Sequence, residues 1–164
     1  MEKQSKVDFE EVMSIFLQQN AETPERNDWP VRALEIANNQ FRTWTRGILH
    51  PRELGEIMLP RHNHGSNLVP NVGASVSQTL KRLDAVDRSS ECYKRIEQMW
   101  DPGDSAIFLS VAPILPTIND SHYMDYIGLV RRGHLGLTHL DGLHRLIAWA
   151  IEDKRSVLAY IAGL

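Results

Sequence analysis

The most constraining stretch of this 164-residue chain lies near its C-terminus, where a strand pattern passes into a helix pattern through Asp141 and Gly142. Residues 136–140 are apolar and contain threonine, as in a strand, and residues 143–153 carry apolar side chains at helical spacing. Residues 157–161 then predict a closing strand. We expect Asp141 to cap the helix, because its carboxylate can accept hydrogen bonds from first-turn amides. A strand, a tight turn and a helix in this order are typical of an α/β fold.

The same turn places potential anion-binding groups at the start of the predicted helix. Gly142 allows close approach to the backbone, and His144 and Arg145 fall in the first helical turn. The unpaired amides and the positive end of the helix dipole also lie there, so this turn favours a phosphate or another anion. Arg145 is suited to that role because a guanidinium can form two parallel hydrogen bonds with phosphate.

The composition limits the class of protein. Hydrophobic residues make up 42% and charged residues 24%, which is ordinary for one globular domain with a buried core. A net charge of −3 argues against nucleic-acid binding as the main role, although a local basic face stays compatible with it. The single cysteine, Cys92, excludes an internal disulfide and a multi-cysteine metal site. Because no apolar run is long enough to cross a membrane and residues 1–6 lack a signal-peptide core, we expect a cytoplasmic location.

Periodicity in the rest of the chain predicts a small mixed sheet with flanking helices. Residues 7–19 and a segment from Pro30 to Gly47 predict two helices, which form an expected helical extension over residues 1–47. The expected second part, residues 48–164, packs with it into one compact unit. Within that part the pattern predicts helices at 73–86 and 90–100 and strands at 57–59, 105–111 and 126–132.

The turn of residues 141–145 has the sequence Asp-Gly-Leu-His-Arg and precedes an apolar helix. This pattern resembles the ParB/sulfiredoxin-like superfamily, whose members share a strand, a turn of this kind, a helix and a closing strand. Within the superfamily it looks most like the free-serine kinases. The resemblance covers residues 136–162, and over residues 57–111 it extends only to the order of a strand, helices and a strand.

The resemblance implies a nucleotide-dependent phosphotransferase that acts on a hydroxyl group of a small molecule. Gly142, His144 and Arg145, with His139 beside them, would then hold the phosphates of ATP or ADP together with Mg²⁺. Phosphoryl transfer depends mainly on charge neutralisation and alignment, which such groups supply. The implied partners are a nucleotide and a small-molecule substrate rather than nucleic acid or a membrane.

The resemblance also implies an upstream glutamate as catalytic base. Glu53 and Glu56 are the candidates, because both precede the first strand of the second part of the chain. Asp141 is the candidate ligand for Mg²⁺ or acceptor for the proton of the substrate hydroxyl. Leu143 stands where sulfiredoxins carry their catalytic cysteine, which argues against sulfinic acid reduction.

Three alternatives remain open from the sequence. The first is a non-catalytic ParB-like module that senses nucleotides or binds DNA. The second is a ParB-like nuclease, which would need an acidic metal cluster and a basic groove. A transition-metal site is the third, since His62 and His64 could join Asp141 and either His139 or His144 as ligands.

Overall fold

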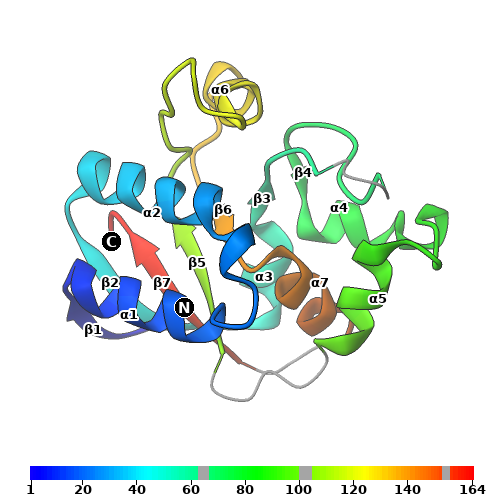
Figure 1. Ribbon diagram of the computed structural model, residues 1–164, viewed down its shortest axis with the longest axis horizontal. Coiled ribbons are helices and arrows are strands. Elements are labelled where there is room, and N and C mark those ends of the chain that lie inside the picture. Colours follow the sequence, from blue (N-terminus) through cyan, green and yellow to red (C-terminus); the bar gives the residue numbers. More distant parts are fainter. Residues whose placement is uncertain (63–66, 100–104, 153–155) are drawn as a thin grey trace.

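Within the described residues, seven strands form one mixed sheet in the order β1-β2-β7-β5-β6-β3-β4 (Figure 1). The computed structural model describes residues 1–62, 67–99, 105–152 and 156–164. Neighbouring strands are antiparallel, except that β5 is parallel to β7 and β3 is parallel to β6. The strands are β1 Glu2–Val7, β2 Trp44–Leu49, β3 Met58–Leu59, β4 Ala74–Ser75, β5 Ala106–Ser110, β6 Thr138–Asp141 and β7 Val157–Ala162.

Helices flank this sheet, so the expected α/β class is confirmed. None of the helices in the described ranges combines the length and the apolar character needed to cross a bilayer. The helices are α1 Phe9–Gln19, α2 Asp28–Phe41, α3 Pro51–Glu56, α4 Val76–Leu80, α5 Glu91–Gln98, α6 Tyr123–Arg131 and α7 Leu143–Ile151, with short 3₁₀ helices η1 Pro24–Arg26 and η2 Leu83–Ala85.

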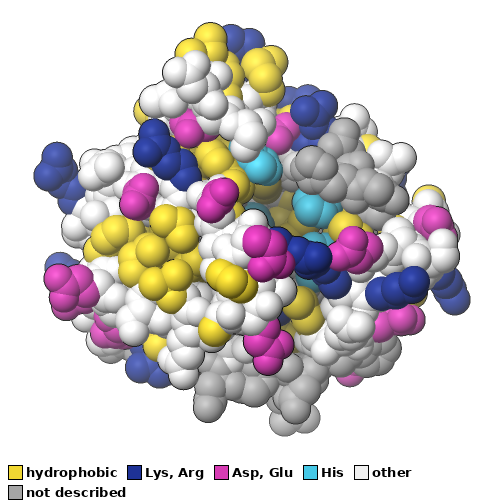
Figure 2. All heavy atoms as spheres, in the orientation of Figure 1, with side chains coloured by type: hydrophobic (Ala, Val, Ile, Leu, Met, Phe, Trp, Pro, Cys, Tyr) yellow, Lys and Arg dark blue, Asp and Glu magenta, His cyan; other side chains and the backbone are white. Residues whose placement is uncertain are grey.

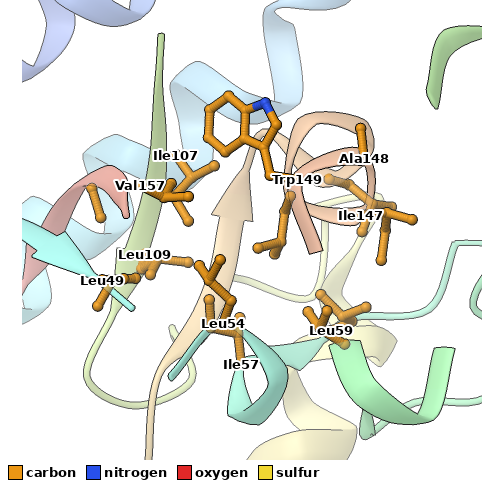
Figure 3. Close-up of a cluster of buried hydrophobic side chains, with 14 of the residues drawn as sticks. Leu49, Leu54, Ile57, Leu59, Ile107, Leu109, Ile147, Ala148, Trp149 and Val157 are labelled. Carbon is orange, nitrogen blue, oxygen red and sulfur yellow. The ribbon is translucent and has the colours of Figure 1, made fainter. Parts of the chain in front are cut away.

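The central strand β5 separates two hydrophobic cores. All five of its residues are buried, and successive side chains point to opposite faces, as the strand period of two requires. Ile107 and Leu109 pack in the core beneath α3 and α7, where Trp149 lies (Figure 3). Ala106 and Phe108 pack in the other core, beneath α1 and α2. The helices on the two faces therefore bury both sides of the sheet.

The first 47 residues are not purely helical, which corrects the expected extension. They supply β1 and the first part of β2, and β2 pairs with β7 along its whole length, so they belong to the same sheet as the rest of the chain. Helix α2 ends at Phe41, followed by Arg42 in the left-handed conformation at φ 61°. Gly47, expected as a helix stop, lies inside β2, and Trp44 faces the core from that strand rather than from a helix.

Two other segments also differ from expectation. The strand expected at residues 126–132 is part of α6, whose Tyr126 and Leu129 are buried at helical spacing. The helix expected at residues 73–86 divides into β4, α4 and η2.

Candidate active site

A cleft of about 780 Å³ opens beside the turn that joins β6 to α7. Its volume falls within the roughly 300–1,000 Å³ of typical small-molecule sites. Figure 2 shows a hollow on this face in which histidine side chains gather, with Arg/Lys and Asp/Glu side chains along its rim. The basic residues that line the cleft are Arg26, Arg61, Arg95, Arg145, His62, His122, His139 and His144.

Gly142 begins α7 and sets the geometry of the turn. Its φ of 92° lies in the left-handed region, which favours glycine, and a Cβ there would lie 3.2 Å from a methyl carbon of Ile107. Asp141 is therefore the last residue of β6, and Gly142 takes the capping position expected for it. Glycine has no side chain with which to cap, and no described side chain accepts from the first-turn amides of α7 in its place.

Arg145 is held at the wall of the cleft by two oxygen acceptors. Its Nη2 donates to Oδ2 of Asp141 at 3.1 Å, and its Nη1 donates to Oε1 of Gln19 at 2.7 Å. The same Gln19 oxygen accepts from the backbone N–H of Ala106 at 3.0 Å. Burial raises the pKa of the Asp141 carboxyl, and the adjacent Arg145 guanidinium opposes that rise. The end of α1 thus fixes the guanidinium at the start of α7.

Cys92 lies between two imidazoles inside the cleft. Its Sγ is 3.2 Å from Nε2 of His62 and 3.2 Å from Nε2 of His144. The two rings are nearly perpendicular, at 83°, with centroids 5.4 Å apart. Cys92 belongs to the first turn of α5, which Ser90 caps by accepting from the N–H of Tyr93. Packing of α5 against α7 brings the thiol to His144.

His139 lies beside this group on β6 and is 6% exposed. Burial, with smaller contributions from His62 and His144, lowers its pKa to about 3. Burial, together with His62, likewise lowers the pKa of His144 to about 4. Neither ring nitrogen of His139 has a hydrogen-bond partner among the described residues. At neutral pH both imidazoles are therefore uncharged, and the lone pairs of unprotonated ring nitrogens are available.

The structure brings together most of the residues expected at the site. Those that line the cleft are His139, Asp141, Gly142, His144 and Arg145. His64, named for the transition-metal alternative, lies outside the described residues.

The two expected bases do not join this group. Glu53 and Glu56 lie on α3 and are not part of the cleft lining. The Glu53 carboxylate accepts from the backbone N–H of His50 at 2.9 Å and pairs with the N-terminal amine of Met1. Glu56 pairs with Arg52 at 3.7 Å on the surface. Both glutamates come shortly before β3 in the sequence, but they lie on α3, outside the lining of the cleft that opens beside the turn.

Sequence reasoning missed Cys92 and Gln19 as site residues. Cys92 has a helix-start signal in Ser90, but nothing local indicates that it would lie near His62 or His144, because those neighbours are 30 and 52 residues away in the chain. Trp29, at the start of α2, also lines the cleft and stacks on His122, with ring centroids 4.4 Å apart.

Comparison with known proteins identifies the family of the chain. No curated protein and no solved structure matches the chain. One family model, described as a family of unknown function (DUF6309), matches residues 1–164. The match spans the whole chain, which therefore belongs to the DUF6309 family.

Proposed function

We propose that the cleft binds a phosphorylated small molecule and that the protein transfers a phosphoryl group from a nucleotide to the hydroxyl of a small metabolite. One observation carries the proposal: an open cleft of nucleotide-compatible size begins at the N-terminus of α7. First-turn amides without a side-chain cap, next to a fixed guanidinium, suit a phosphate group. The resemblance of the turn to that of the free-serine kinases supports the same role.

The charge along the rim also favours an anionic ligand. Arg26 and Arg95 both donate to the same carboxylate oxygen of Glu91, at 3.1 and 2.9 Å. Arg26 also pairs with Glu25 at 3.7 Å, so the two guanidinium groups are matched by two carboxylates. Ion pairs between partly exposed side chains of this kind are weak. Both arginines line the cleft, so a phosphate can replace a carboxylate as their partner.

The positions of the acidic side chains determine which carboxylate we assign to the site. Because Glu53 and Glu56 lie outside the cleft, Asp141 becomes the carboxylate that we assign to Mg²⁺ or to the acceptor hydroxyl. Trp29 supplies an apolar wall for the rest of the ligand. The proposal includes a cytoplasmic location, where a thiol such as that of Cys92 stays reduced.

Calorimetric titration of ADP and ATP, with and without Mg²⁺, tests the proposal. We expect saturable binding that Arg145→Lys weakens by about tenfold or more, since a hydrogen bond to a charged group contributes about 1.5–3 kcal/mol. Arg145→Lys keeps the charge but loses the two-pronged donor geometry. Arg52→Ala is the matched control, because its side chain is 91% exposed and lies outside the cleft.

The catalytic part is tested by ADP release from ATP in the presence of hydroxyl-bearing metabolites. Turnover that requires both ATP and an acceptor supports phosphotransfer. Nucleotide binding without turnover on any acceptor would support the sensing alternative instead. Equal nucleotide affinity in wild type and Arg145→Lys, with both variants folded by circular dichroism, would refute the proposed phosphate contact.

A further inference from the structure

The thiol of Cys92 and the imidazole of His62 have no role in the proposed phosphoryl transfer, and both lie beside His144 inside the cleft. Their donor atoms, one on each of His62, Cys92 and His144, all lie within 4.8 Å of one another. We infer that these three residues form a binding site for one divalent transition-metal ion, with zinc as the ion that fits best. This inference goes beyond the proposed function and does not depend on it.

The chemistry of the donors selects the class of metal. A thiolate and two imidazole nitrogens are the soft and borderline donors that zinc takes in proteins, whereas Mg²⁺ and Ca²⁺ prefer oxygen. The three donors are contributed by separate parts of the chain: His62 by the segment that bridges to Val69, Cys92 by α5 and His144 by α7. A metal ion would therefore link elements that are distant in sequence.

The distances are close to those of a coordinated ion. A sulfur and a nitrogen bound tetrahedrally to zinc lie about 3.6 Å apart, and two nitrogens about 3.3 Å apart, given bond lengths of about 2.3 and 2.0–2.1 Å. Sγ of Cys92 lies 3.2 Å from Nε2 of each histidine. Shifts of a few tenths of an ångström at the sulfur, with a modest approach of the two rings, would complete this geometry.

One feature of the surroundings supports a metal ligand set over a chance cluster. His139, which is 6% exposed and also lines the cleft, has both ring nitrogens without a partner among the described residues. An unpartnered polar ring in so buried a position indicates a ligand that the protein atoms do not supply.

Three protein ligands leave one position of a tetrahedral zinc ion for water or substrate. All three residues line the cleft, so that position would be accessible to a molecule bound there. Structural zinc sites, in contrast, have four protein ligands. The cluster therefore fits a metal that contacts a bound ligand, and an oxygen donor such as a phosphate, carboxylate or hydroxyl is the chemistry it would take.

Cobalt(II) titration of the chelator-treated full-length protein tests the site, because cobalt reports both its ligands and its geometry. We expect binding of one equivalent, with a sulfur-to-cobalt charge-transfer band and the intense visible absorption of a tetrahedral ion. Zinc should displace the cobalt. Cys92→Ser should remove the charge-transfer band and weaken zinc binding by more than about a hundredfold, beyond the 10–100-fold that loss of an outer-shell partner costs.

His144→Asn should weaken zinc binding to a similar extent, and His134→Gln is the matched control because it lies outside the cleft lining. Absence of one-equivalent binding by the wild-type protein would overturn the inference, as would a charge-transfer band that persists in Cys92→Ser. These titrations contain no nucleotide, and the nucleotide titrations can be run with chelator and without divalent ions. Failure of either set of measurements therefore leaves the other intact.

Discussion

Replacing Gln19 with alanine should destabilise the protein, because one side-chain oxygen of Gln19 serves two donors from different elements. Loss of the hydrogen bond from Arg145, which carries a charge, costs about 1.5–3 kcal/mol, and loss of the neutral bond from the Ala106 N–H costs about 1 kcal/mol. Removal of the buried Nε2 of Gln19, which has no partner among the described residues, offsets about 1 kcal/mol of this loss. The expected net loss in the free energy of unfolding is about 2 kcal/mol.

Urea denaturation measures this loss directly, and a thermal melt should show a decrease in Tm of about 4–8 °C for a chain of this length. Gln18→Ala is the matched control, since Gln18 is the exposed neighbour of Gln19 on α1. It should change the free energy of unfolding by less than about 0.5 kcal/mol. If the two variants prove equally stable, the hydrogen bonds of Gln19 do not fix Arg145 as described.

Further predictions concern the turn and its surroundings. Gly142→Ala should destabilise the protein by about 1–2 kcal/mol in urea denaturation, because alanine is strained at a φ of 92°; an unchanged midpoint would contradict the turn geometry. Tyr126→Phe should cost about 1–2 kcal/mol by the same assay, because the buried Tyr126 hydroxyl donates to the His139 carbonyl oxygen at 2.8 Å. The metal-free protein should lose about 2 kcal/mol of stability between pH 7 and pH 5 through His139, since the unfolded chain takes up a proton near pH 6.5 and the folded chain only near pH 3. A smaller loss is expected in His139→Leu, and an identical pH dependence in that variant would refute the assignment.

The sequence predicted those elements whose pattern is local. Helix α5 follows its Ser90 cap, and β5 is a short apolar run with turn residues on its N-terminal side. The unit β6–α7–β7 was predicted within a few residues, because its periodicity changes from two to helical spacing at Gly142. Asp141 was wrongly expected as the cap, since Asp is a frequent capping residue and the sequence does not show that β6 continues through it.

The errors arose where tertiary packing overrides local preference. The segment of residues 126–132 contains β-favouring residues, yet it is helical because Tyr126 and Leu129 bury one face of α6. Trp44 begins a strand because β2 pairs with both β1 and β7, and those pairings are not visible in the local pattern. The thiol–imidazole cluster could not be predicted for the same reason, because packing of α5 against α7 brings Cys92 to His144.

The central claim is that an anionic ligand binds where α7 begins, and a crystal structure of the protein with ADP and Mg²⁺ tests it most directly. The account predicts phosphate oxygens within hydrogen-bonding distance of the first-turn amides of α7, inside the cleft lined by Arg145. Phosphates bound elsewhere on the protein, or a cleft that stays empty at saturating ADP, would contradict it.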